Sequence, residues 1–399
     1  MPPEMRTLNE GGIEFLVPAI DGDRPTSRMP AFYNPQMSTS RDIALLCAGA
    51  YSPTQEGGIV ACDLLAATGI RGLRLLRVPK IREIYINDIG KTAFELMHRN
   101  LERNYEAVAL DEDGEGTWLR VGNADVHLTN SEALLFLARR KHQFHLVDLD
   151  PFGSPAGLIQ PSIKSLRHGS MLAVTATDTA TLCGTYPGTC MRRYGSRSLK
   201  TDYRHEAGIR ILIAYIARVG ASMERGIIPL FSHATAHYYR VYLKVMGSRQ
   251  AANDSLSRTG WGYHCLECSS RSFSNAFVPE SVSCCGREME IFGPLWTGSI
   301  WDGGFVQSVG EANRPEYSIG TEALEIVDNV SREPDLYSYY DLHHASRLMG
   351  IPAPKTQDVI SRLASMGYEA GPTHVTGTGV KTDAGVEELR RAISGLSRG

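Results

Sequence analysis

Short apolar runs alternate with helical patterns through the first half of this chain, and this alternation constrains the fold more than any other feature. The runs cover 58–62, 83–86, 118–121, 144–147 and 171–175. Helical patterns over 91–104 and 132–141 lie between them, and a glycine-containing loop, 66–72, opens a further helix. Strands that alternate with helices in this way predict an α/β fold with a doubly wound, mostly parallel sheet.

Acidic residues follow the first three runs. They are Asp63, Asp88 and Asp125. Ligands of open α/β sheets bind at the carboxyl ends of the strands. The loop after the first run has only Gly69 and Gly72, so it lacks the glycines of a dinucleotide fingerprint. Three acids would also repel a pyrophosphate, but they suit an adenosine with a cationic tail. We therefore predict S-adenosylmethionine as the cofactor; solvated strand ends or helix caps are the alternative.

The fourth run leads into the segment 148–155, which reads Asp-Leu-Asp-Pro-Phe-Gly-Ser-Pro. Asp150 and the Pro151 carbonyl can accept the two N–H bonds of a planar amine, and Phe152 can stack on its ring. A base inside a duplex cannot reach such a pocket, so we expect base flipping. Asp148 is the competing acid. The simpler alternative is a strand end followed by a turn, with Phe152 in the core.

The net charge of the chain does not indicate a nucleic-acid partner, but a local run of basic residues does. The 399 residues include 41 basic and 44 acidic side chains, for a formal net charge of -3. A basic run follows the acceptor motif, with Tyr194 and Tyr203 interleaved as expected base-stacking residues. We predict RNA binding by this run; a solvated protein surface is the alternative. Its members are Arg192, Arg193, Arg197, Lys200 and Arg204.

Polar residues 247–258 predict a linker between a catalytic domain, 1–246, and a C-terminal RNA-binding domain, 259–399. Four cysteines in that second domain predict a structural zinc ribbon over 263–289. Adjacent ligands need a distorted turn, so His264 is an alternative ligand, and a metal-free ribbon is another alternative. The pattern over 336–395 predicts a winged-helix-like segment. The cysteines are Cys265, Cys268, Cys284 and Cys285.

Taken together, these motifs resemble the tRNA guanine-26 N2-dimethyltransferases, in particular the archaeal members. The resemblance implies that Arg41, Arg71, Asp88, Ala124 and Asp125 bind S-adenosylmethionine. It implies that Asp150 and Phe152 handle the guanine, and that one amino group receives two methyl groups. The matching segments are 32–35 with 41–42, 63–72, 87–88, 123–125, 148–155, 185–187, 205–206 with 210–212, 238–245 and 293–296.

We therefore expect a tRNA methyltransferase. Two other functions stay open: amino-methylation of rRNA or of a protein glutamine, and non-enzymatic nucleic-acid binding by a zinc-ribbon and winged-helix protein. The N-terminus has no apolar signal core, and the longest apolar stretches are too short to span a bilayer. We expect a cytoplasmic protein without membrane contact, and a monomer.

Overall fold

The computed structural model describes residues 4–53, except 20–30, and residues 57–396, except 236. The chain forms two compact units that interleave along the sequence. The first unit comprises Met1–Thr175, Tyr242–Gly247 and Gln307–Val327, and the second comprises Ala176–Val241, Ser248–Val306 and Asp328–Gly399. The division into 1–246 and 259–399 stays a prediction. The linker expected over 247–258 is instead mostly helix α9 (Arg249–Ser257), which is capped by Ser248.

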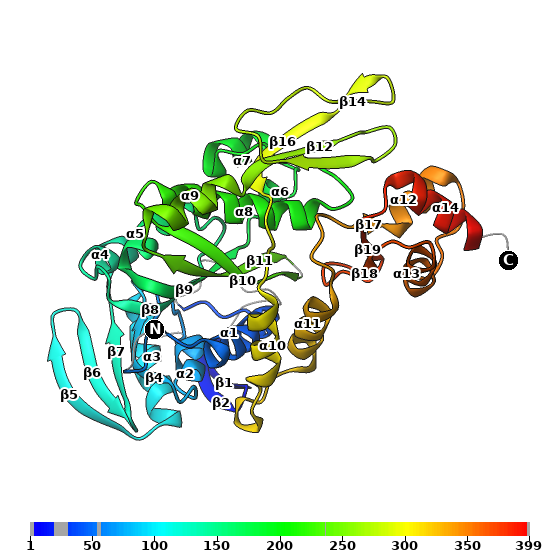
Figure 1. The fold of residues 1–399 in the computed structure, drawn as a ribbon. Coiled ribbons are helices and arrows are strands. Elements are labelled where there is room, and N and C mark those ends of the chain that lie inside the picture. Colours follow the sequence, from blue (N-terminus) through cyan, green and yellow to red (C-terminus); the bar gives the residue numbers. More distant parts are fainter. Residues whose placement is uncertain (1–3, 20–30, 54–56, 236, 397–399) are drawn as a thin grey trace. The chain divides into compact units, whose positions relative to one another are not determined.

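A large, mostly parallel sheet forms the centre of the first unit, which confirms the predicted α/β fold (Figure 1). Its order in this unit is β9-β8-β3-β4-β7-β6-β5, and the end of β11 (Tyr238–Met246) lies beside β9. The strands from β9 to β7 are parallel to one another, whereas β6 and β5 are antiparallel. The bounds are β3 (Ile59–Asp63), β4 (Ile81–Asn87), β5 (Ala107–Asp113), β6 (Gly116–Val121), β7 (Ala124–Thr129), β8 (Phe144–Leu149) and β9 (Leu166–Ala176).

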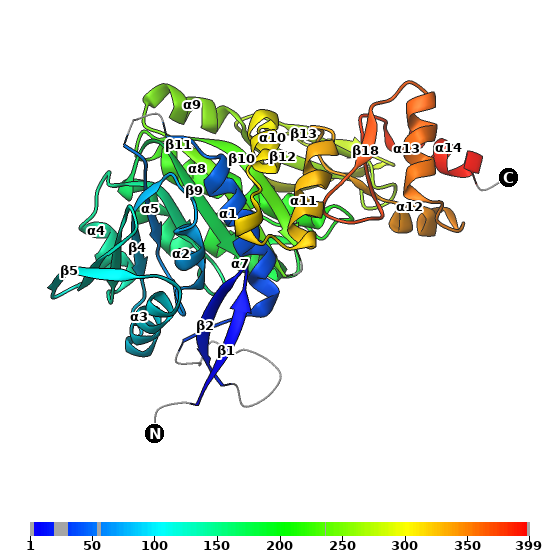
Figure 2. The ribbon, with the colours of Figure 1, turned by 90° about the horizontal axis from the view of Figure 1, so that it is seen from below.

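The strand order reverses between β3 and β8. From β3 the chain runs outward to β4 and β7, and it then returns to β8 and β9 on the other side of β3. Right-handed crossovers therefore place α2 and α3 on one face of the sheet, and α4 and α5, which are neighbours in Figure 2, on the other. Such a reversal marks the ligand site of this fold class. The helices are α1 (Ser38–Ala50), α2 (Ile70–Leu75), α3 (Lys91–Asn104), α4 (Ala133–Ala138) and α5 (Ala156–Ser165).

The third parallel strand is β7 and not the run 118–121, so the prediction was wrong here. That run is β6, an antiparallel strand. The chain reverses at residues 122–123, where Gly122 has a φ of 55° that favours glycine. As a result, Asp125 lies near the start of β7, opposite Glu83, and Thr129 ends β7 opposite Asn87.

The N-terminal segment contains a hairpin. Strands β1 (Met5–Glu10) and β2 (Ile13–Pro18) are antiparallel, and β2 buries Phe15 and Leu16. The amide of Asn100 on α3 binds both the N–H and the C=O of Leu16, at 2.7 and 3.2 Å. The hairpin is thereby fixed to the first unit.

The second unit contains a long buried helix, the cysteine ribbon and a winged-helix-like segment. The sheet order β17-β19-β18, with α12 and α13 between β17 and β18, confirms that predicted segment. The elements are α6 (Thr179–Leu182), α7 (Pro187–Tyr194), α8 (Arg204–Ala221), β10 (Gly226–Thr235), β12 (Thr259–His264), β13 (Arg271–Ser274), β14 (Ser283–Cys284), β15 (Arg287–Glu288), β16 (Glu290–Trp296), β17 (Tyr340–Asp341), α12 (Leu342–Met349), α13 (Thr356–Ser365), β18 (Ala370–Pro372), β19 (Gly379–Thr382) and α14 (Val386–Leu396). Helices α10 (Gly303–Glu311) and α11 (Thr321–Arg332) run from one unit into the other.

Candidate active site and metal centre

The loop after β3 folds tightly against the end of β4. The N–H of Ala66 donates to the carbonyl of Asn87, and the N–H of Ala67 donates to Asp88 Oδ2, both at 2.8 Å. Gly69 has a φ of 79°, and a Cβ there would lie 3.1 Å from Met97 Cγ. Small residues are therefore required in this loop, because the backbone approaches both the sheet and α3.

Asp63 and Asp88 lie at the carboxyl ends of neighbouring strands, as predicted. Asp63 is buried, and its Oδ2 accepts the N–H of Gly72 at 3.0 Å, so it holds the first turn of α2. Asp88 is half-buried, and its other oxygen accepts the N–H of Gly90 at 2.8 Å. Each carboxylate oxygen of Asp88 still has a second lone pair for a ligand hydroxyl.

Asp148 and Asp150 share the guanidinium of Arg71 across the strand-order reversal. Asp148 pairs in register with Asp63 on the adjacent strand. Arg71 Nε lies 3.4 Å from Asp148 Oδ1, and Arg71 Nη2 contacts Asp150 Oδ2. Asp148 is 2% exposed and Asp150 is 20% exposed, so Asp150 is the acid that a substrate can reach.

This cluster has three carboxylates and one guanidinium. Burial and the charge of Asp148 together raise the pKa of Asp63 to about 7, against the opposing charge of Arg71. Additional positive charge at this edge would be stabilised by the carboxylates. A cationic ligand therefore suits the site.

Phe152 lies at the surface, which excludes the alternative that it belongs to the core. Its side chain is 57% exposed. Phe32, from the segment before α1, contacts it edge to face, with the ring centroids 4.4 Å apart. Phe32 belongs to the matching segment 32–35, but its role did not emerge from the sequence. The two rings form an aromatic wall suited to a planar base.

Arg41, for which cofactor binding stays a prediction, lies in a buried ion network. Arg41 binds Glu10 through Nε at 2.6 Å and Nη2 at 2.5 Å, and it donates to the carbonyl of Asn34 at 3.1 Å. Tyr33 donates its hydroxyl to Glu10 at 2.9 Å. The network fixes the backbone next to Phe32.

Ala124 and Asp125 do not join the acidic edge. Both lie at the start of β7, and the carboxyl ends that hold Asp63 and Asp88 are at the opposite end of the strands. Asp125 instead pairs with Arg120 at 2.5 Å. The residue that follows β7 at the correct edge is Asn130, whose amide donates to the carbonyl of Asp88 at 2.8 Å. The strand-like run 126–129 is the sequence signal that could have identified Asn130 as the residue after the strand.

The basic run lies in the second unit, on and after α7, and most of its cations are at the surface. Arg192, Arg193, Arg197 and Lys200 are exposed and Arg204 is half-buried. The expected stacking role of the interleaved tyrosines is wrong, because both are buried.

Tyr194 donates its hydroxyl to Asp178 at 2.7 Å. Tyr203 lies under the guanidinium of Arg271, which is 4.3 Å from its ring centroid.

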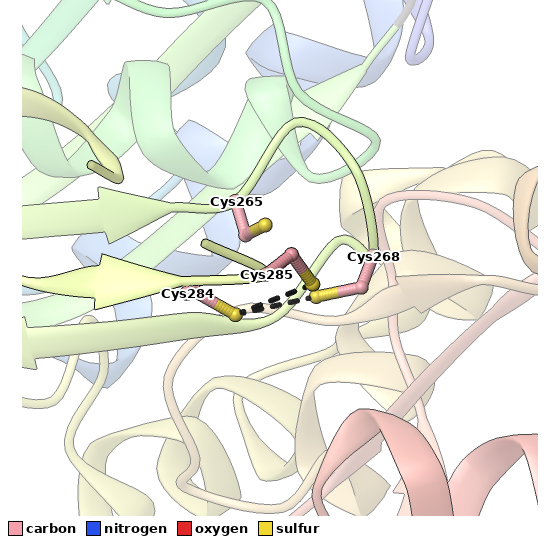
Figure 3. A group of neighbouring side chains, drawn as sticks. All are labelled: Cys265, Cys268, Cys284 and Cys285. Atoms are coloured by element: carbon pink, nitrogen blue, oxygen red, sulfur yellow. Dashed lines mark hydrogen bonds between the residues drawn. The ribbon is translucent and has the colours of Figure 1, made fainter. Parts of the chain in front are cut away.

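The four cysteines of the ribbon meet at one point. Figure 3 shows their side chains pointing toward one another. Their four Sγ atoms lie within 4.8 Å of one another, and those of Cys268 and Cys284 are 3.5 Å apart. A tetrahedral zinc with Zn–S bonds of about 2.3 Å requires sulfur separations of about 3.8 Å. The donor set therefore fits a structural zinc ion.

A tight turn resolves the problem of two adjacent ligands. Cys285 and Gly286 connect β14 to β15 and have φ angles of 53° and 73°. Two left-handed residues make a type I′ hairpin turn, which brings both Cys284 and Cys285 to the same side. His264 lies outside this group and contacts the hydroxyl of Tyr203, with 3.4 Å between Nδ1 and the oxygen.

Among the described residues, the structure contains no helix with the length and apolar character needed to cross a bilayer.

The model of the family described as N2,N2-dimethylguanosine tRNA methyltransferase matches residues 13–394. A tRNA (guanine(26)-N(2))-dimethyltransferase of Methanothermobacter thermautotrophicus is 34% identical over 98% of this chain and 99% of its own. The Methanosphaerula palustris relative is 35% identical over 97% and 98%.

The solved structure of Trm1 from Pyrococcus horikoshii with S-adenosyl-L-methionine has a TM-score of 0.86 and 30% identity. That similarity covers 97% of this chain and 99% of the other. Sequence, fold and site geometry thus agree over nearly the whole length, and the chain belongs to the N2,N2-dimethylguanosine tRNA methyltransferase family.

Proposed function

We propose that this protein is an enzyme that transfers methyl groups from S-adenosylmethionine to the N2 amine of guanine 26 in tRNA, twice in succession. The observation that carries this proposal is the Asp150–Phe152 segment beside the acidic strand ends, where Asp150 is partly exposed and Phe152 is exposed. Family membership supports the substrate, and the likeness to a structure with bound S-adenosyl-L-methionine supports the donor. The alternatives of rRNA, protein glutamine or non-enzymatic binding have no comparable support.

The residues that fit the donor are those of the acidic edge. Asp88 would accept the ribose hydroxyls, and Asn130 borders the same strand end. Arg71, beside Asp150, offers a cation for the donor's carboxylate. Asp63 would act indirectly, because it is buried and holds α2. When bound, S-adenosylmethionine supplies an electrophilic methyl group on a sulfonium.

The acceptor residues act on the lone pair of the guanine amine. That lone pair is delocalised into the ring, and transfer requires it to point at the methyl carbon. Asp150 and the Pro151 carbonyl would hold the two N–H groups, while Phe152 and Phe32 bound the base. As the N–C bond forms and the S–C bond breaks, the amine loses a proton to Asp150 or to water. One N–H remains for the second transfer.

Two further sets of residues would bind the RNA backbone and a metal ion. The exposed cations Arg192, Arg193, Arg197 and Lys200, with Arg204, would bind the tRNA backbone. Cys265, Cys268, Cys284 and Cys285 would hold zinc in a structural role, because four protein ligands leave no open position for chemistry. We also propose that the protein is a monomer and that it acts in the cytoplasm.

Replacing Asp150 with asparagine tests the acceptor site. Single-turnover methylation of a tRNA transcript should fall by roughly 100-fold to 10,000-fold, the usual contribution of a positioned acid or base. Calorimetric titration with S-adenosylmethionine should give a Kd within about threefold of that of the wild type. Retained turnover would refute the role of Asp150, and Asp254→Asn, at an exposed aspartate of α9, serves as the control.

A further inference from the structure

The surface around α7 is electropositive and carries an exposed aromatic side chain. From Thr179 to Thr201 the sequence contains no Asp or Glu, but it contains the cations Arg192, Arg193, Arg197 and Lys200, in a chain of net charge -3. Tyr186 at the start of α7 is 58% exposed, and Met191 is 51% exposed. A single exposed tyrosine is ordinary. An exposed ring within a cationic stretch without acids is the combination that single-stranded nucleic acid binds.

The acids that flank this stretch have buried side chains, and only one of them, Asp178, pairs with a cation of the stretch. Asp178 is 7% exposed and accepts from Arg193 Nη1 at 3.0 Å. Asp202 is 2% exposed and accepts from Arg271 Nη2 at 2.9 Å. Arg197 is the one cation of the stretch with a part-exposed acidic partner in the described chain, Glu290 at 2.5 Å.

The backbone of Tyr186 is fixed while its side chain projects outward. Its N–H donates to the carbonyl of Ala180 at 3.3 Å, and its own carbonyl accepts the N–H groups of Thr189 and Cys190 at 3.1 and 3.0 Å. The inner face of α7 is anchored by the fully buried Cys190 and Tyr194. A ring presented from such a backbone loses little conformational entropy when a base stacks on it.

We propose that Tyr186 stacks on an unpaired base of the substrate tRNA, and that Arg192 and Lys200 contact phosphates next to that base. This inference rests on the proposed function for the identity of the RNA. It assigns to Tyr186 the stacking role that Tyr194 and Tyr203 cannot fulfil. It also separates two contributions: a stacking contribution independent of salt, and a phosphate contribution that depends on salt.

The test measures the Kd of a fluorescently labelled tRNA transcript by anisotropy over a series of salt concentrations. Tyr186→Ala should raise the Kd by about 5-fold to about 150-fold, the range for loss of one base–aromatic stack. Tyr186→Phe should bind within about twofold of the wild type. Arg192→Ala should reduce the slope of log K against log salt by roughly 1, and Tyr186→Ala should leave that slope unchanged.

Leu110→Ala is the control, because Leu110 is 51% exposed on β5 of the first unit and lies next to Asp111 and Glu112, away from the basic run in sequence. It should leave the Kd unchanged. An unaltered Kd for S-adenosylmethionine in Tyr186→Ala shows that this variant is folded.

A Tyr186→Ala Kd within about twofold of the wild type would overturn the inference. An equal effect of Leu110→Ala, or a Tyr186→Phe variant that binds as weakly as Tyr186→Ala, would also overturn it. These outcomes concern affinity alone, whereas failure of the proposed function would appear as absence of methylation by the wild type.

Discussion

Replacing Lys381 with methionine should loosen the winged-helix-like segment, because Lys381 is the central cation of a buried ion network. Its Nζ lies 2.7 Å from Glu333 Oε1 and 3.2 Å from Glu206 Oε2, and all three side chains are at most 1% exposed. Burial would raise the pKa of Glu333, but the charges of His374 and Lys381 hold it below its usual range. The network connects β19 to α8 within the second unit.

The magnitude follows from what remains after the substitution. Removing one partner of a buried pair costs about 3–5 kcal/mol, because a charge stays buried without compensation. Here each carboxylate retains another partner: Glu206 keeps Arg210 at 2.7 Å, and Glu333 keeps His374 at 2.5 Å. We therefore expect the free energy of opening this segment to fall by the lower end of that range, about 3 kcal/mol. Since 1.4 kcal/mol is a factor of ten, opening of this segment should become about 100-fold more frequent.

Hydrogen exchange read by mass spectrometry measures this opening directly. Amides of β19 in Lys381→Met should exchange about 100-fold faster than in the wild type. Lys355→Met, at an exposed lysine before α13, is the control and should change exchange by less than about threefold. Equal exchange in the wild type and in Lys381→Met would refute the reasoning that the buried charges need this cation.

Three further predictions concern RNA, metal and pH. Arg193→Glu should raise the KM for tRNA by roughly tenfold through lost phosphate attraction, and an unchanged KM would show that this arginine does not face the RNA. Cys268→Ser should lower the zinc content, measured by plasma mass spectrometry, from about one ion per chain and should lower the Tm; equal zinc content would contradict the four-cysteine site.

Asp63 has a folded-state pKa of about 7, above its ordinary value. Its ionisation therefore lowers the free energy of unfolding above that pH. Below about pH 4 it has no such effect, because the side chain is protonated in both the folded and the unfolded state. Asp63→Asn should therefore gain stability against urea, relative to the wild type, at pH 8 but not at pH 4, and a gain at pH 4 alone would contradict the sign.

Most of the fold could be predicted because its signals are local. Apolar runs and their acidic ends indicated the parallel strands, and the positions of Asp63, Asp88 and Asp150 followed from them. The error at β7 arose because only two residues join β6 to β7, so Asp125, just after the turn, was taken as the end of a strand. The turn decides whether the next strand runs parallel or antiparallel, and the apolar pattern of a strand is the same in both cases.

The contacts between distant segments could not be predicted. Phe32 reaches Phe152 across more than a hundred residues, and Arg41 is held by Glu10 of the N-terminal hairpin. Neither contact leaves a spacing signal in the sequence. Burial could not be predicted either: Tyr194 lies within the basic run and Tyr186 lies just before it, but Tyr194 is buried whereas Tyr186 is 58% exposed. Functional surfaces of this kind require tertiary structure.

Nucleoside mass spectrometry of a tRNA transcript, after incubation with the protein and S-adenosylmethionine, tests the central claim most directly. A transcript with guanine at position 26 should yield N2,N2-dimethylguanosine at that position, and a transcript with adenine there should stay unmodified. Methylation of a different base, or no methylation by a protein that binds the donor, would contradict the account of Asp150 and the acidic strand ends.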